Sequence, residues 1–197
     1  LDPRRKIVGL FPGSRRNEIE RLLPVIVDAA TILQHDFPDI QFVLPLASTL
    51  AKEDILPRLE GRGLNVHISS DRIHDLIRSC DAIISVSGTV TLEIALVGTP
   101  MVIIYRLAAL TYQLAKRLVK VENIGLCNIV AGGTVVQELI QDDASPENMA
   151  AEITRLLTDD TYNQGIRERL SAIRSRLGEG GASANVARLA INMIGPK

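Results

Sequence analysis

The sequence predicts an α/β fold built on a parallel sheet with helices on both faces, and two observations support this prediction. Short apolar runs rich in β-branched residues, which are typical of strands, alternate with segments of helical length and periodicity. In particular, one helix-length segment separates an apolar run at 81–86 from another at 101–105, which is the spacing of two parallel strands and their crossover. Repeated along the chain, this alternation indicates a Rossmann-like sheet.

The individual elements follow from the period of the apolar residues. We expect strands at 6–11, 41–46, 65–69, 81–86 and 101–105. We expect helices at 18–36, 49–59, 71–78, 108–121 and 135–140, with a further one directly after residues 87–88. Pro24 falls inside the first helical pattern, where it would kink the helix or mark its true first turn. Asp71 is expected to cap the third helix, and 123–131 is expected to be irregular, with a strand as an alternative at Gly125 and Leu126.

The end of the chain is predicted to be a helical tail. Ser145 suits an N-cap and Pro146 suits the first helical position, so a helix is expected from there to about 157. Two more helices are expected at 162–177 and 182–194. We therefore divide the chain into a Rossmann-like domain at 1–145 and a helical tail at 146–197 that packs on it. Because the sequence starts without Met and goes almost directly into a strand, we expect it to be a piece of a longer protein.

Composition argues against several classes of function. Hydrophobic residues make up 46% of the 197, which is enough for a sizeable core. Aromatic residues at 3%, the lack of Trp and a net charge of −1 argue against a nucleic-acid-binding surface. No apolar run is long enough to span a bilayer. Cys80 and Cys127 lie far apart without a CxxC pair, so we expect two buried core thiols.

Two loops form the candidate binding site. The first loop (residues 12–15) and the second loop (residues 87–89) each follow an expected strand and precede an expected helix. Ligands of parallel α/β sheets bind outside the carboxyl ends of the strands, and both loops fall at that edge. We therefore predict that the two loops meet over one ligand.

The first loop carries residues suited to a phosphate. Gly13 lets the backbone approach a ligand closely, Ser14 offers a hydroxyl, and Arg15 can hold phosphate oxygens bidentately. The loop is neither a Walker motif nor a GxGxxG dinucleotide turn. A tight turn with solvated arginines is the alternative.

The second loop offers an anion site and, one turn later, a carboxylate. Ser87, Gly88 and Thr89 mark a helix start, where free N–H groups and the helix dipole favour a phosphate. Glu93 lies four residues after Thr89 on the same helix face, in an otherwise apolar segment. A carboxylate there needs a partner. We expect a sugar diol to be that partner, and a neighbouring cation within the fold is the alternative.

Other polar residues allow weaker predictions. Asn128 and Gln137 flank a Gly-Gly pair and could contact a ligand, or merely satisfy their own loop. His74 falls near the same sheet edge and could approach a base or phosphate, with a solvated or capping role as the alternative. The three histidines share no metal-ligand spacing, so no metal site is predicted. No Ser-His-Asp set, Cys-His set or carboxylate pair stands out, so the residues indicate binding more clearly than a catalytic base.

The expected helix at 108–121 is basic and amphipathic, because Lys116, Arg117 and Lys120 stand beside several leucines. Such a helix can lie on an anionic membrane surface. A helix with a solvated basic face is the alternative.

Taken together, these motifs resemble the lipid-A-disaccharide synthase family. The resemblance covers nearly the whole chain in the family's order, and it rests on LFPGSR at 10–15 with Glu18-Ile19, SGTVTLE at 87–93, PMVIIYR at 100–106, AKRLVK at 115–120, NIVAG at 128–132, VQELI at 136–140, LG at 177–178 and GAS at 181–183. The short pieces are unspecific singly, and the set is specific.

The resemblance implies one half of a glycosyltransferase-B fold, namely the carboxyl-terminal half that binds the UDP-sugar. The implied enzyme is a hexosyltransferase that moves 2,3-diacylglucosamine from UDP to 2,3-diacylglucosamine 1-phosphate, forming a β-1,6 disaccharide and UDP. It would work without metal or organic cofactor, in the cytoplasm at the inner face of the bacterial inner membrane, in peripheral contact with lipid. A homodimer is left open.

The resemblance also implies roles for residues. Gly13, Ser14 and Arg15 would face the diphosphate from one side and Ser87, Gly88 and Thr89 from the other. Arg15 would stabilise the leaving group, Glu93 would hold the ribose, and Asn128 and Gln137 fall in matching segments. The general base and much of the acceptor site would belong to an amino-terminal domain that this sequence does not contain, and the last helix would pack partly on that domain.

Two departures bear on these implications. Cys127 stands where the family commonly has Pro, and the amino-terminal half is missing. The alternatives are another UDP-sugar enzyme of the same fold, such as a UDP-N-acetylglucosamine 2-epimerase or the murein glycosyltransferase, or a non-catalytic nucleotide-binding module.

Overall fold

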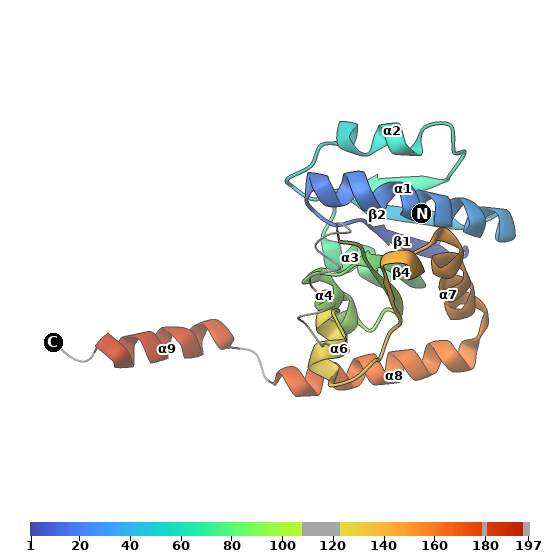
Figure 1. The fold of residues 1–197 in the computed structure, drawn as a ribbon. Coiled ribbons are helices and arrows are strands. Elements are labelled where there is room, and N and C mark those ends of the chain that lie inside the picture. The colour runs from blue at the N-terminus through green and yellow to red at the C-terminus, as the bar shows by residue number, and fades with distance from the viewer. Residues whose placement is uncertain (108–122, 179–180, 195–197) are drawn as a thin grey trace.

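The computed structural model describes residues 1–107, 123–178 and 181–194, and within them it contains one parallel sheet of six strands (Figure 1). The strand order is β3-β2-β1-β4-β5-β6, and every neighbouring pair is parallel. The strands are β1 Ile7–Phe11, β2 Gln41–Pro45, β3 Val66–Ser69, β4 Ala82–Val86, β5 Met101–Tyr105 and β6 Glu138–Ile140. The predicted α/β Rossmann-like sheet is confirmed, and all five expected strands lie within two residues of their predicted bounds.

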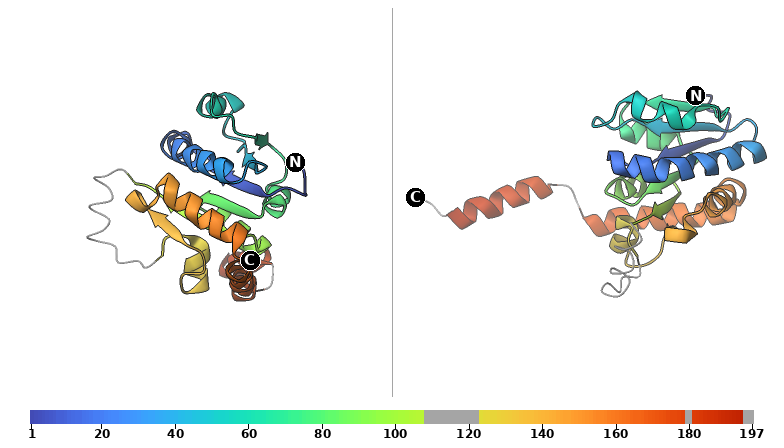
Figure 2. Two further views of the ribbon diagram at one scale, coloured as in Figure 1. Left: turned by 90° about the vertical axis from the view of Figure 1, so that its right-hand side faces the viewer. Right: turned by 45° about the horizontal axis from the view of Figure 1, so that its top comes forward.

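The helices cover both faces of this sheet. Helices α1, α2 and α7 form one group by their contacts, while α3, α4 and α8 pack together on the other side, with α6 against α4 and α8 (Figures 1 and 2). The helices are α1 Arg16–Asp36, α2 Leu56–Leu59, α3 Ile73–Ser79, α4 Val90–Val97, α6 Leu126–Ala131, α7 Pro146–Thr158, α8 Asp160–Leu177 and α9 Ala182–Ile194, with 3₁₀ turns at Lys52–Asp54 and Gln141–Asp143.

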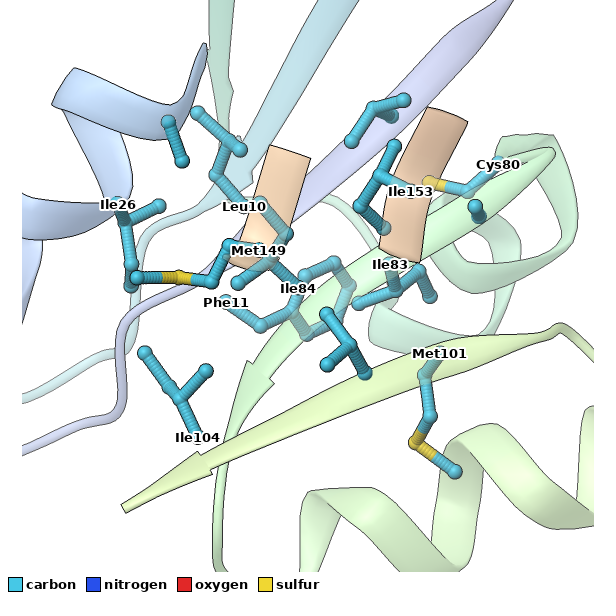
Figure 3. Close-up of a cluster of buried hydrophobic side chains, with 14 of the residues drawn as sticks. Leu10, Phe11, Ile26, Cys80, Ile83, Ile84, Met101, Ile104, Met149 and Ile153 are labelled. Carbon is cyan, nitrogen blue, oxygen red and sulfur yellow. The ribbon is translucent and has the colours of Figure 1, made fainter. Parts of the chain in front are cut away.

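The core lies in the two layers between sheet and helices. In the pairing of β1 with β4, Leu10 stands opposite Ile84, and both are completely buried. Figure 3 shows part of this core, where Ile26 of α1 and Met149 of α7 belong to the same buried cluster. Burying side chains of this size stabilises the fold by roughly 1.5–3 kcal/mol each.

The order of strands creates a topological switch point. β1 and β4 are neighbours, and the helices that follow them, α1 and α4, leave toward opposite faces of the sheet. The loops after these two strands therefore diverge and leave a crevice between them. This is the place where the two candidate loops lie.

Helix α1 runs without interruption from Arg16 to Asp36, so Pro24 lies in its interior and does not mark the first turn. Its apolar face, with Ile19, Leu23 and Ile26 fully buried, packs on α7 and the sheet. That tertiary packing outweighs the hydrogen bond that Pro24 cannot make.

Two predictions between residues 123 and 140 are wrong. Residues 126–131 form helix α6, with Gly132 at φ +69° ending it, where an irregular stretch or strand was expected. Residues 138–140 form strand β6 beside β5, where a helix was expected. The reason is tertiary, because Leu139 is buried opposite Ile104 at the edge of the sheet, and local periodicity does not reveal that neighbour.

Two further local predictions need correction. The segment expected as one helix at 49–59 is a 3₁₀ turn followed by the single turn of α2. The N-cap of α3 is Arg72, and Asp71 is not its cap, because the Asp71 carboxylate accepts a hydrogen bond from the hydroxyl of Ser69 instead.

The predicted start of the tail is confirmed, because Ser145 caps α7 by accepting a hydrogen bond from the N–H of Asn148 at 3.2 Å, and Pro146 occupies the first helical position. Helix α7 packs on α1, β4 and β5, and α8 packs on α4, α6 and α7. Helix α9 extends away from the body of the molecule (Figures 1 and 2), and Val186, Leu189 and Ile191 on it are exposed. The domain boundary at residue 145 stays a prediction.

In the described part of the chain, no helix is long and apolar enough to cross a membrane. The basic helix predicted at 108–121, with Lys116, Arg117 and Lys120, lies outside the described residues.

The prediction that both cysteines are core thiols is confirmed. Cys80 and Cys127 are free and buried, and Cys80 lies on the α3 side of the sheet. Burial penalises the thiolate and raises the pKa of each thiol to about 12.

We expect both thiols to resist iodoacetamide in the native protein and to react readily in denaturant, as followed by mass spectrometry. Because the unfolded thiols ionise near their ordinary pKa of 9.0, stability should fall as pH rises from there toward 12. Cys80→Ser and Cys127→Ser variants show which of the two thiols is alkylated in each experiment. Fast labelling of the native protein at neutral pH would contradict the burial.

Candidate functional site

A cavity of about 590 Å³ lies at the carboxyl ends of the strands, over the switch point between β1 and β4. Both candidate loops line it. The predicted residues on its wall are Gly13, Ser14, Arg15, Ser87, Gly88 and Thr89. The remaining described residues on the wall are Phe11, Glu18, Pro45, Leu46, Ala47, Ser48, Asp71, Ile73, Val86, Val90 and Leu126. Two loops more than 70 residues apart in sequence thus share one hollow, as the sequence predicts.

The first loop has a conformation that requires glycine. Gly13 has φ +100°, a value that L side chains rarely adopt, and a Cβ there would collide with the Glu18 carboxylate. The loop is also held by the turn that follows β2, because the Thr49 hydroxyl donates to the carbonyl oxygen of Ser14 at 2.7 Å. The loop is therefore fixed before any ligand arrives.

The Glu18 carboxylate folds back over the first loop. Its Oε2 accepts from the N–H of Ser14 at 3.2 Å and of Arg15 at 3.3 Å, and its Oε1 accepts from the Arg15 guanidinium at 2.8 Å. Glu18 is the third residue of α1, so this carboxylate also satisfies N–H groups at the helix start. The Arg15 side chain remains 81% exposed.

The second loop presents unused backbone donors. Ser87 is anchored, since its N–H donates to Ile104 and its hydroxyl donates to Ile124 at 3.2 Å. Among the described residues, the N–H groups of Gly88, Thr89 and Val90 donate no hydrogen bond. These groups start the eight-residue helix α4, whose dipole places partial positive charge at this end.

Glu93 lies one turn further along α4 and is not part of the cavity wall. Its Oε2 is 3.4 Å from Nε2 of His74 on α3, and the two side chains are 40% and 56% exposed. The neighbouring-cation alternative therefore has a structural partner whenever His74 is protonated. Val90, which is on the wall, precedes Glu93 by one turn of α4, and the contact of Glu93 with a sugar stays a prediction.

Asn128 is completely buried in α6, and its side chain makes four hydrogen bonds with nitrogen and oxygen atoms of the fold. Its Oδ1 accepts from the N–H groups of Val135 and Val136, and its Nδ2 donates to the carbonyl of Val136 and to Glu138 Oε1 at 2.7 Å. This is the loop-satisfying role that the sequence left as an alternative.

Gln137 is exposed beside β6 and lines a different hollow, with Asn148 of α7 and Arg155. Neither Asn128 nor Gln137 is on the described wall of the switch-point cavity. Their contact with substrate stays a prediction.

Sequence reasoning missed several residues of the wall. Glu18, Ser48 and Asp71 all follow carboxyl ends of strands or begin the helix after one, so the rule that found the two loops could also have found them. Arg15 is the one cation on the described wall, and Glu18 and Asp71 are carboxylates. Across residues 1–107, 123–178 and 181–194, no group of three or more His, Cys, Asp or Glu side chains is placed to hold a metal ion.

The fold is shared with several solved structures. UDP-GlcNAc 2-epimerase from Neisseria meningitidis, solved bound to UDP-GlcNAc, has a TM-score of 0.63 at 18% identity, covering 96% of this chain and 46% of that one. The C-terminal domain of a group 1 family glycosyl transferase (LpcC) from Francisella tularensis has a TM-score of 0.58 at 14% identity, with coverages of 86% and 84%. WaaG, a glycosyltransferase involved in lipopolysaccharide biosynthesis, has a TM-score of 0.58 at 14% identity, with coverages of 85% and 42%. The chain therefore has the Rossmann-like fold of one half of the glycosyltransferase-B architecture.

Sequence comparison narrows this class. The family model described as lipid-A-disaccharide synthetase matches residues 1–188, so the chain belongs to that family. Proteins named lipid-A-disaccharide synthase are 65% identical in Trichlorobacter lovleyi, 56% in Geobacter sulfurreducens and 43% in one strain of Coxiella burnetii, over 98%, 99% and 98% of this chain. Each alignment covers 51% of the relative, so the chain spans about half the length of the curated relatives it matches. The resemblance seen in the sequence is confirmed.

The two glycines of the site should respond differently to alanine. Gly13→Ala forces a side chain into a left-handed backbone and against Glu18, and we expect it to destabilise the protein by about 1–2 kcal/mol or more. Gly88→Ala meets open space, so urea unfolding should show little change. Equal stability of the two variants would contradict the described loop geometry.

For Asn128→Ala, we expect a loss of at least about 2 kcal/mol of unfolding free energy, because the buried N–H group of Val136 and the partly buried one of Val135 lose their acceptor. Asn123→Ala, which removes one exposed hydrogen bond from Thr134, serves as a control and should change stability little. Denaturant unfolding measures both. If Asn128→Ala were as stable as the parent protein, the structural role assigned to Asn128 would be contradicted.

Proposed function

We propose that this chain is the donor-binding half of a lipid-A-disaccharide synthase. The reaction of the whole enzyme moves 2,3-diacylglucosamine from UDP to 2,3-diacylglucosamine 1-phosphate, giving the β-1,6-linked disaccharide and UDP. The observation that carries the proposal is the meeting of the first and second loops in one cavity at the switch point, in a chain of this family. The cavity volume of about 590 Å³ falls within the ordinary range for small-molecule sites.

The proposed ligand of the two loops is the diphosphate. The open N–H groups at the start of α4 offer donors and a favourable dipole, and Arg15 offers a planar cation across the cavity. As the sugar departs, negative charge develops on the phosphate oxygens. Donors already fixed in place stabilise that charge by a few kcal/mol each, which makes Arg15 the proposed leaving-group stabiliser.

Glu93 is the proposed partner of the ribose diol. Glu93 lies one turn beyond the second loop on α4, and at 40% exposure its carboxylate can accept hydrogen bonds from a ligand. The contact to His74 at 3.4 Å leaves lone pairs of the carboxylate free. Asn128 and Gln137 are proposed to contribute less directly, through the 132–137 loop that Asn128 anchors.

The rest of the proposal concerns the whole protein. The acceptor site and the general base would lie on the half that the relatives have and this sequence lacks, and the cleft between the halves would hold the acyl sugars. A lipid substrate requires access to a membrane surface, so we place the enzyme in the cytoplasm as a peripheral protein of the bacterial inner membrane. A homodimer is compatible with this arrangement.

Another UDP-sugar enzyme of the same fold is the nearest alternative, because the Neisseria epimerase was solved with UDP-GlcNAc on this fold. The full-length protein separates the two when assayed with acylated and with unacylated UDP-glucosamine. Turnover of the unacylated donor alone would favour the alternative.

We expect the chain to bind one UDP, measured by isothermal titration calorimetry. Arg15→Ala should weaken binding by ~10-fold or more, because a charge-assisted hydrogen bond is lost. Arg16→Ala is the matched control, since Arg16 pairs with Asp54 of the 3₁₀ turn at 3.6 Å and is not on the described wall. Lack of UDP binding by the parent chain would refute the nucleotide site.

In the full-length enzyme, Arg15→Ala should lower kcat by roughly 10²-fold while leaving the unfolding midpoint nearly unchanged, since the side chain is exposed and, among the described residues, hydrogen-bonds to Glu18 alone. The present chain alone should bind UDP and transfer no sugar. Unaltered turnover would exclude Arg15 from the mechanism, and turnover by the isolated chain would show that the base lies within it.

A further inference from the structure

The cavity contains two sets of anion-binding groups, and only one of them is already occupied by an anion of the protein itself. At the second loop the N–H groups of Gly88, Thr89 and Val90 are open, among the residues that the structure describes. At the first loop the corresponding donors are already occupied by a carboxylate from the protein itself. That carboxylate belongs to Glu18.

The contacts of Glu18 have the pattern of a bound phosphate. One oxygen accepts from two consecutive backbone N–H groups at 3.2 and 3.3 Å, and the other accepts from the Arg15 guanidinium at 2.8 Å. The carboxylate also lies directly against Gly13, where any Cβ would exclude it. Two anions cannot share these donors, because their like charges would stand within one hydrogen-bond length of each other.

We propose that Glu18 is a placeholder for the diphosphate, a positioning residue that holds the first loop and Arg15 in their binding conformation and swings away when the nucleotide arrives. This inference rests on the proposed function. It assigns an order to binding, in which the diphosphate first meets the open second loop and then displaces Glu18 from the first. On product release the carboxylate returns to the same donors, which weakens the hold on UDP and speeds its departure.

A purely structural role for Glu18 predicts something different. As the third residue of α1 it caps the helix, and a cap alone would leave nucleotide affinity unchanged or lower it when removed. Glu18→Gln separates the two roles. The amide oxygen can still accept from the backbone N–H groups, while the negative charge that competes with phosphate and pairs with Arg15 is gone.

The test compares the parent chain, Glu18→Gln and Glu20→Gln by calorimetry with inorganic pyrophosphate and with UDP. Glu20 is an exposed residue of α1, so its variant makes the same charge change on the same helix away from the loop. We expect Glu18→Gln to bind both ligands ~3- to 10-fold more tightly than the other two proteins. Affinity of Glu18→Gln equal to or weaker than that of Glu20→Gln would overturn the placeholder.

The outcomes separate this inference from the proposed function. Tighter pyrophosphate binding by Glu18→Gln without UDP binding by any protein supports the placeholder and refutes the nucleotide. Equal affinity of the parent chain and of Glu18→Gln for UDP refutes the placeholder role and supports the nucleotide site. Binding of neither ligand by any protein overturns both.

A second measurement needs no variant. In the ¹³C-labelled parent chain, saturation with pyrophosphate should shift the NMR signal of the Glu18 side-chain carboxyl carbon, together with the amide signals of Ser14 and Arg15. A carboxyl signal that stays in place while the two amides shift would show that Glu18 is not displaced.

Discussion

The parallel pairing of β1 with β4 is the constraint on which the rest of the molecule depends. It sets Phe11 opposite Ser85 at the carboxyl ends of two neighbouring strands, which lie about 4.8 Å apart. Because α1 and α4 then leave toward opposite faces, the chain cannot fill the space above the pair. The crevice is thus a product of connectivity, and the residues that begin each loop are the ones placed to use it.

Much of the fold could be predicted because its strands are strongly apolar and its helices are long. The central strands around Ile84 and Ile103 and the 21-residue helix α1 carry their periodicity in the sequence. Strand β6 does not, since only Leu139 of its three residues is buried and its pairing with β5 is set by tertiary contacts. Helix α6 is a single short element stopped by Gly132, and its start has no side-chain cap to reveal it.

The site was predictable to the extent that ligands of parallel sheets bind outside the carboxyl ends of the strands. That rule brought the first and second loops together, but it could not distinguish residues on the wall from residues behind it. Asn128 was indistinguishable in sequence from a ligand-binding amide, and only the positions of Val135, Val136 and Glu138 reveal four internal bonds. Glu93 and His74 come from different helices, so their proximity follows from the packing of α3 on α4.

The anion-binding donors at the two ends of the cavity differ in whether a carboxylate of the protein already occupies them. At the α4 end the donors are backbone N–H groups, and no described carboxylate is bonded to them. At the α1 end the donor is Arg15, and the Glu18 carboxylate is already paired with it. Arg15 is thereby kept beside the loop although its side chain is largely in solvent. A cation preordered in this way loses less side-chain entropy on binding than a free one.

The short strand β6 has a consequence for the behaviour of the protein in concentrated solution. Among the residues that the structure describes, it is the edge strand of the sheet and is only three residues long. The carboxylate of its first residue, Glu138, accepts hydrogen bonds from the N–H groups of Ile124 and Gly125 and from Nδ2 of Asn128. Because this edge strand is short and begins with a charged residue, it offers few backbone groups with which a strand of a second molecule could pair. A short edge strand of this kind disfavours edge-to-edge aggregation on this side of the sheet.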